Sequence, residues 1–174
     1  MPELSVLLDQ AVKMLNRVRE EIESNVVSRS KELDARKVSL AAGIFKSVGE
    51  MADFLETLKN RLSSAKLGER STVAVGENTY LTLEGNVFTI SKLRPVRRMV
   101  SFNSDSSTLV VKSGDNLVEI RPDGITVKTR AGVFKFNPSD LEDYENRFDE
   151  LRAASKVIQN SISDCVGIIG QKIK

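Results

Sequence analysis

Two stretches of this sequence carry positive charge without any acidic residue. The first runs from residue 86 to residue 104 and contains Lys92, Arg94, Arg97 and Arg98. Guanidinium and ammonium groups gathered in this way can bind the carboxylates of a protein or the phosphates of a nucleic acid. The stretch is therefore a candidate binding surface.

The second acid-free run contains Lys128, Arg130 and Lys135. Side chains alternate between the two faces of a strand, so Lys128 and Arg130 are expected on one face, opposite Ile125 and Val127. Residues 69–137 as a whole hold 10 basic and 7 acidic side chains, whereas the net charge of the whole chain is only +2. The candidate contact residues for a partner or for phosphate are Lys92, Arg94, Arg97, Arg98, Lys128 and Arg130.

The nature of that contact stays open between two interpretations. A small antiparallel β module with a basic face is a frequent host for nucleic acid. Aromatic residues make up only 5% of the chain, and Phe88, Phe102, Phe134 and Phe136 alternate with polar residues as core positions do. Tyr80 is then the one obvious platform for base stacking. We therefore expect a solvated face or a contact with an acidic protein partner, with a phosphate-backbone contact as the alternative.

The chain lacks the residues on which most common enzyme mechanisms depend. The chain has no His, so His-based acid–base catalysis, catalytic triads and His-ligated metal sites are excluded. Cys165 is the single cysteine, and its place on an apolar helical stripe predicts a buried side chain. The phosphate-loop, dinucleotide-binding, nucleophile-elbow and zinc-protease motifs are all missing. We predict no catalytic, cofactor-binding or metal-ligating residue, and no enzyme.

The basic residues belong to a region of closely spaced turns. Eight short β-rich runs are expected, at 71–75, 79–84, 86–90, 96–102, 107–112, 116–121, 125–130 and 133–136. Turns this frequent leave no room for crossover helices, so the sheet must be an antiparallel meander, folded as a small barrel, a sandwich or a curled sheet.

Long helices are expected on both sides of the β region. Apolar residues recur at helical spacing and predict helices over about 3–26 and 31–65. A capping box formed by Ser139 and Glu142 predicts that a third helix starts at 139 and runs to about 172. The first helix carries a narrow apolar seam, which must pack either within the chain or against a second copy. The candidate oligomer seam is Leu4, Leu8, Ala11, Leu15, Val18 and Ile22.

These elements predict an α+β protein. The helices of residues 1–68 and 138–174 are expected to form a coiled-coil-like stalk or bundle, with residues 69–137 inserted as an all-antiparallel β head. The expected function is a non-enzymatic assembly or interaction module, in which the stalk serves oligomerisation and the head binds a partner. The alternative is a nucleic-acid-binding protein. No cofactor and no membrane contact are expected, and the lone cysteine and the lack of a long apolar stretch favour a cytoplasmic location.

Overall fold

The β region forms one open antiparallel sheet. In the computed structural model, which describes residues 4–29, 31, 34–63, 72–76, 78–93 and 97–170, eight strands follow one another in the order β1 to β8. Their bounds are Thr72–Gly76, Thr79–Glu84, Val87–Lys92, Arg97–Asn103, Thr108–Ser113, Asn116–Arg121, Gly124–Thr129 and Gly132–Phe136. Each lies within two residues of an expected run, so the meander is confirmed. β1 and β8 are the two edges of the sheet, and no barrel closes.

Turn chemistry explains why the strands end where they do. Gly85 and Gly114 adopt positive φ in the two-residue connections β2–β3 and β5–β6. Asn103 follows the same logic with its side chain, whose Oδ1 accepts a hydrogen bond from the backbone N–H of Asp105 at 2.9 Å. These local devices set the register of the sheet and hence the face to which every side chain points.

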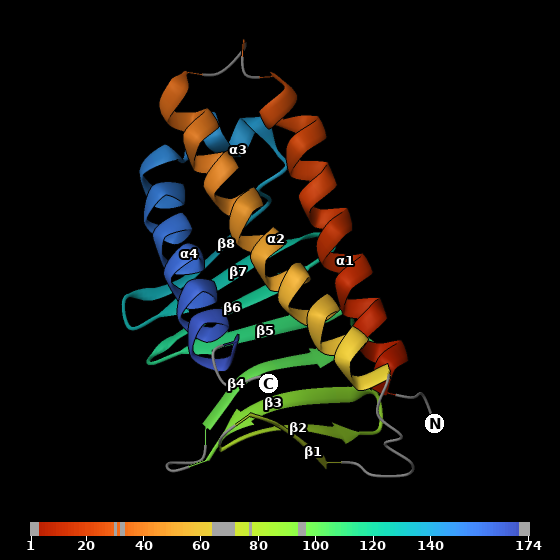
Figure 1. The fold of residues 1–174 in the computed structure, drawn as a ribbon. Coiled ribbons are helices and arrows are strands. Elements are labelled where there is room, and N and C mark those ends of the chain that lie inside the picture. The colour runs from red at the N-terminus through yellow and green to blue at the C-terminus, as the bar shows by residue number, and fades with distance from the viewer. Residues whose placement is uncertain are drawn as a thin grey trace.

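The helices form a layer against one face of the sheet. α1 is Leu4–Asn25, α2 is Ala35–Ser63, α3 is Leu141–Asn146 and α4 is Phe148–Gly170, with a short 3₁₀ turn at Val27–Arg29. α1 contacts β3 and β6, while α4 contacts β5, β6 and β7, so both helices cross the strands (Figure 1). α2 packs on α1 and α4 on the side away from the sheet.

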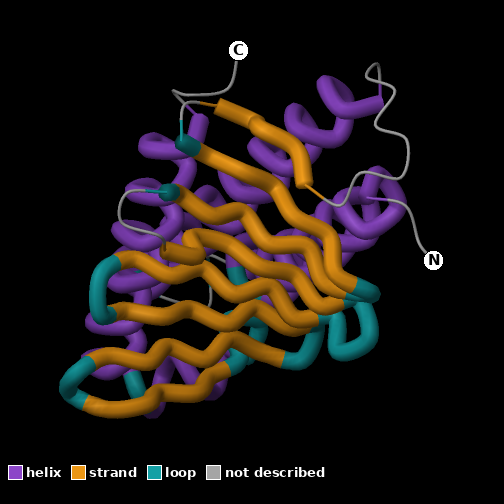
Figure 2. Tube along the Cα trace, turned by 90° about the horizontal axis from the view of Figure 1, so that it is seen from below, coloured by secondary structure: helices purple, strands orange, loops and turns teal. Residues whose placement is uncertain are grey.

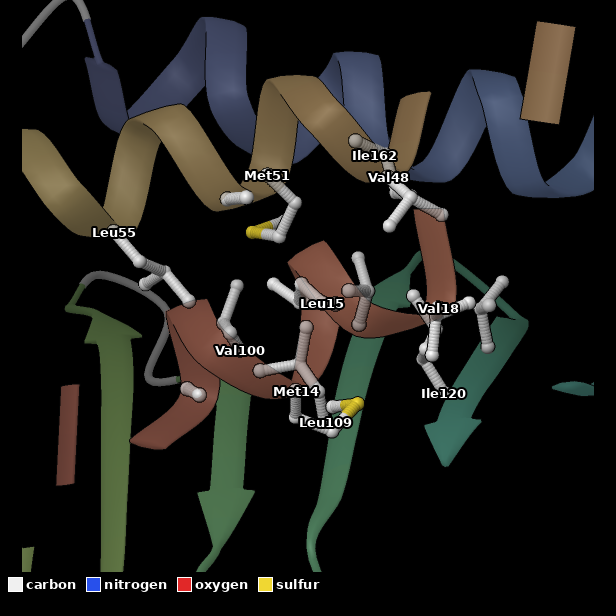
Figure 3. Close-up of a cluster of buried hydrophobic side chains, with 14 of the residues drawn as sticks. Met14, Leu15, Val18, Val48, Met51, Leu55, Val100, Leu109, Ile120 and Ile162 are labelled. Carbon is white, nitrogen blue, oxygen red and sulfur yellow. The ribbon is translucent and has the colours of Figure 1, made fainter. Parts of the chain in front are cut away.

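A single buried cluster joins the three layers. Leu15 of α1 lies between Met51 of α2 and the sheet residues Val100 and Leu109, and all four are buried (Figure 3). Burying the apolar face of the sheet is the main reason for this arrangement, because a sheet with one apolar face must cover it. The helices therefore lie on the β layer instead of extending from it as the expected stalk.

The third helix differs from the expectation in its start and its continuity. Its N-cap is Asp140, whose Oδ1 accepts a hydrogen bond from the N–H of Glu142 at 2.9 Å, and not Ser139. Arg147, with φ −133° and ψ 34°, interrupts the helix and separates α3 from α4. The expected single helix is therefore two.

Candidate functional site

The meander brings both basic runs to the same end of the sheet. In consecutive antiparallel strands, the ends of β3, β5 and β7 lie beside the starts of β4, β6 and β8. Lys92 is the last residue of β3, and Arg97 and Arg98 are the first two residues of β4. Lys128 is the last residue but one of β7. Arg130 follows in the β7–β8 turn. Five of the six candidate residues thus share this end, and Arg94 lies outside the described residues.

The register separates these residues between the two faces. Lys92 is paired with Arg97, and Ser91 is paired with Arg98 beyond an irregularity in the β3–β4 ladder. Consecutive residues of a strand point to opposite faces, so Arg97 and Arg98 do not point the same way. Arg97 lies on the helix side, where its charge acts to lower the pKa of Cys165 on α4. Arg98 lies on the open face.

Ion pairs distinguish the two runs further. Lys128 Nζ lies 3.1 Å from Glu119 Oε1, and an Arg130 nitrogen lies 2.7 Å from Asp115 Oδ2. No ion pair within the described ranges involves Lys92, Arg97 or Arg98, although acids stand elsewhere on the sheet. Lys128 and Arg130 therefore each have an acidic partner, although Glu119 also pairs with Arg121 and Lys135 forms no ion pair among the described residues. The described cations of the first run have no acidic partner.

Sequence reasoning missed Lys112. It stands near the end of β5, is exposed, and forms no ion pair in the part of the chain that the structure describes. Its neighbour Val111 is fully buried under the helices, so Lys112 points to the open face, at the same end as Arg98. Because Asp115 follows within three residues, Lys112 does not stand in a long stretch without acids and was not selected from the sequence. The alternation of burial along β5 is the signal that finds it.

The sheet face opposite the helices is covered by no described element. Figure 2 looks onto this face, with the strands in front of the helices. Its central row of cross-strand partners consists mainly of short hydroxyl-bearing and β-branched residues. From β1 to β8 the row is Thr72, Thr82, Thr89, Ser101, Val110, Glu119, Thr126 and Lys135. We call this surface the open face.

Aromatic residues stand almost wholly on the other side. Phe88, Phe102 and Phe136 are buried under the helices, as expected, and Phe134 is partly buried against the same core. Tyr80 is paired with Ser91, which is paired in turn with Arg98, so it shares a row with that cation on the open face. It is half-buried. The open face thus offers one aromatic ring beside a positive charge.

The edge strand β8 is partly capped. Arg147 donates a hydrogen bond to the backbone oxygen of Lys135 at 3.1 Å, and its guanidinium lies 4.3 Å from the ring centre of Phe134. Capping of an outward-facing carbonyl is one way in which proteins block further strand pairing. Glu150 holds the same guanidinium at 3.2 Å. Arg147 therefore links the α3–α4 junction to this edge.

The candidate oligomer seam lies in the interior of the chain. The exposed fraction is 8% for Leu4, 3% for Val18 and 0% for Leu8, Ala11, Leu15 and Ile22. These side chains pack against α2 and the sheet. Of the two expected possibilities, the structure shows the seam packing within the chain, and it leaves these side chains no surface for a second copy.

Cys165 is a buried structural residue, as expected. It is fully buried, and its thiol lies 3.3 Å from the backbone oxygen of Lys112. Burial raises the pKa of the thiol to about 12, with a further contribution from the negative charge of Asp164. A thiol with this pKa is protonated at neutral pH and is a poor nucleophile.

A cleft of about 320 Å³ lies between the β7–β8 hairpin and α4. Its walls are mostly small and apolar, including Val127, Ala153 and Val157, and its ionisable lining residue is Glu150. Because that carboxylate is held by Arg147, the cleft presents no nucleophile with a neighbouring base.

Comparison of the chain with protein-family models, with curated proteins and with solved structures finds no match. Among the described residues, no helix combines the length and the apolar character needed to cross a membrane.

Proposed function

We propose that this chain is a non-enzymatic interaction module whose open face binds a partner. The observation that carries the proposal is the asymmetry of the sheet. α1 and α4 contact β3, β5, β6 and β7 from one side, and no element among the described residues covers the other face. In this proposal the helix layer is the support and the sheet is the binding element.

The composition of the open face supports a binding role over a plain solvated one. The charged residues that the register places on it are mostly basic: Arg98, Lys112, Arg121, Lys128 and Lys135 against Glu84 and Glu119. A solvated face is usually more evenly mixed in sign, because interspersed charges avoid a field of one sign. The short Ser and Thr side chains of the central row let a partner approach the backbone closely.

The same charges argue that the partner is a different molecule and not a second copy. Two open faces brought together would place like charges opposite one another, which is unfavourable. The apolar seam of α1 is already used within the chain. We therefore carry the expected partner-binding role forward to the sheet and do not assign oligomerisation to the helices.

The test is a substitution that changes the open face alone. Ser101 lies at the centre of this face, and Ser101→Glu adds a longer, negative side chain there. Ala42, exposed on α2, gives the matched control Ala42→Glu on the helix layer. Molecules that co-purify with the tagged native protein are identified, and the dissociation constant of the purified complex is measured for each variant.

We expect Ser101→Glu to weaken binding at least tenfold and Ala42→Glu to leave it unchanged, with equal thermal stability for both. Loss of binding in Ala42→Glu alone would move the interface to the helices. Equal binding by both variants would remove the open face as the site.

A further inference from the structure

The proposed function leaves the chemistry of the partner open, and one cluster of side chains bears on it. Arg98 and Lys112 on the open face, with Lys92 and Arg97 on the helix side, lie at one end of three adjacent strands, β3, β4 and β5. We call these four residues the basic rim. Arg97, Arg98 and Lys112 are exposed, and Lys92 is half-buried.

The basic rim lacks internal neutralisation. Within the described ranges, none of its four residues forms an ion pair, in contrast to Lys128 and Arg130 at the same end. Two acids lie nearby. Asp164 of α4 accepts a hydrogen bond from Ser113 at 3.2 Å, and Asp115, in the turn after β5, is paired with Arg130. Four cations thus stand against two acids, one of which is already paired, so the rim keeps a net positive field that attracts an anion.

The arrangement of the four charges suits an extended polyanion. Neighbouring strands lie about 4.8 Å apart, so each face carries one pair of cations on adjacent strands: Arg98 and Lys112 on the open face, and Lys92 and Arg97 on the helix side. Together the four charges follow the end of three strands over roughly 10 Å. The four cations lie at the outer end of the sheet, and none of them lines the cleft between the β7–β8 hairpin and α4. A chain with closely spaced charges can follow this end of the sheet without having to enter a pocket.

Apolar side chains beside the rim are few and only partly exposed: Tyr80 in the row of Arg98, and Leu117, the cross-strand partner of Lys112. Tight protein interfaces depend on large apolar or aromatic side chains that become buried at their centre. Among the described residues, the exposed large hydrophobic side chains are Val6, at 44% exposure, and Val133, at 62%. Val6 is on α1, and Val133 is on β8, four strands from β4. Contacts to phosphate need no such anchor.

From these observations we infer that the basic rim binds the phosphate backbone of a nucleic acid, without reading its bases. The inference rests on the proposed function and names the partner of the same sheet. Arg98 and Lys112 contact phosphates from the open face, and Lys92 and Arg97 contact them from the helix side. Tyr80 supplies a single stacking surface in the row of Arg98, too little for sequence-specific recognition of a single strand.

This assignment reverses the order expected from the sequence, which favoured an acidic protein partner. The reason is the pairing pattern. Lys128 and Arg130, which made the basic face look broad, are held by acids of the same sheet. What remains is a group of cations without acidic partners at the end of β3, β4 and β5, with only Tyr80 and Leu117 as partly exposed apolar neighbours.

The experiment is a titration of the full chain against fluorescently labelled probes. The probes are a single-stranded DNA and a single-stranded RNA of about 20 nucleotides and a DNA duplex of the same length. Retention or anisotropy is measured between about 50 and 200 mM salt, because binding driven by phosphate contacts weakens steeply over this range. We expect dissociation constants within or below the range of about 10⁻⁴–10⁻⁶ M that is typical of non-specific binding at physiological salt.

Three variants make the test specific to the rim. Arg98→Ala with Lys112→Ala removes two proposed contacts and should flatten the log–log salt dependence by about 1.8 for duplex and about 1.4 for single strands. The matched control is Arg17→Ala with Lys46→Ala, an exposed arginine and an exposed lysine of the helix layer, which should change nothing. Lys128→Ala with Arg130→Ala removes cations that already have partners and should have a smaller effect than the rim variant.

Several outcomes would overturn the inference. One is no binding of any probe at protein concentrations up to about 10⁻⁴ M at physiological salt, since that concentration covers the range typical of non-specific binding. A second is an equal loss in the rim and helix-layer variants. A third is a higher affinity for poly-L-glutamate than for nucleic acid, which would assign an acidic protein to the rim. If the probes fail while Ser101→Glu still abolishes binding of a co-purified protein, the inference falls and the proposed function stands.

Discussion

Leu15 is the side chain whose replacement tests the layered packing most directly. It is fully buried in α1, between α2 and the sheet (Figure 3). Leu15→Ala removes three carbon groups, which at about 0.8 kcal/mol each gives roughly 2.4 kcal/mol of lost transfer free energy. Packed layers stand on both sides and can collapse only partly, so a cavity contribution of about 1 kcal/mol is added. We expect a total loss of about 3–4 kcal/mol in the free energy of unfolding.

The assay is thermal unfolding at protein concentrations that differ by about tenfold or more. For a domain of this length the expected loss lowers Tm by roughly 6–16 °C. Because the apolar seam of α1 packs within the chain, the Tm of wild type and of Leu15→Ala should not depend on protein concentration. If the seam instead packed between two copies, Tm would rise with concentration.

Val6, in the same helix but 44% exposed, provides the control. Val6→Ala should change the free energy of unfolding by less than about 0.5 kcal/mol. A loss below about 1 kcal/mol in Leu15→Ala, or a Tm that rises with concentration, would refute the packing described here.

Three further predictions follow from single contacts. The thiol of Cys165, whose pKa burial raises to about 12, should resist alkylation at pH 8 in the native protein and react at once in denaturant, as followed by mass spectrometry. Arg147→Ala should uncap β8 and produce concentration-dependent association in light scattering, while Arg152→Ala at an exposed position of α4 should not. Hydrogen bonds from Lys13 and Lys59 lower the pKa of Asp9, so the stability that Asp9 adds is present above its unfolded pKa near 4 and is lost as the pH falls through the native value. The stabilities of wild type and Asp9→Asn in urea titrations should therefore differ at pH 7, and the difference should shrink as the pH falls below the unfolded pKa.

The strands were predictable because their signals are local. Six of the seven connections between the expected β runs contain Gly, Asn or Asp, residues that tight turns favour, and Gly85 and Gly114 indeed adopt positive φ. Alternation within each run then predicts the buried positions, as at Phe88 and Phe102. Neither signal depends on distant parts of the chain.

The features that the sequence did not predict depend on contacts between distant segments. The break at Arg147 coincides with a guanidinium that reaches the backbone of β8, twelve residues back, and no Gly or Pro marks it. The shift of the cap from Ser139 to Asp140 accompanies a hydrogen bond from the N–H of Ser139 to Asn137 Oδ1 at 2.9 Å, which uses Ser139 in the preceding turn. A capping pattern shows which residues can cap a helix, and the preceding turn decides between them.

The position of the helices was missed for a related reason. Equal helix lengths on both sides of the β region are as compatible with a projecting stalk as with a layer. The deciding fact is that the sheet has one face rich in Ile, Val, Leu and Phe, and an antiparallel sheet can leave only one face in water. Counting the apolar area of that face would have favoured helices lying across it.

The candidate site illustrates how topology creates a surface that no stretch of sequence contains. In a meander, every second connection falls at the same end of the sheet, so charges at the ends of β3, β5 and β7 converge although they are far apart in the chain. Strand alternation then divides them between two faces, and the acids on neighbouring strands neutralise some of them and leave others free. Lys112 and Lys128 are alike by sequence, both near a strand end and both on the open face, yet Lys128 has Glu119 within 3.1 Å and Lys112 has no ion-pair partner in the described part of the chain. The register of the strands therefore decides which cations have an acidic partner and which can bind another molecule. For this reason, substituting Lys112 should weaken binding more than substituting Lys128.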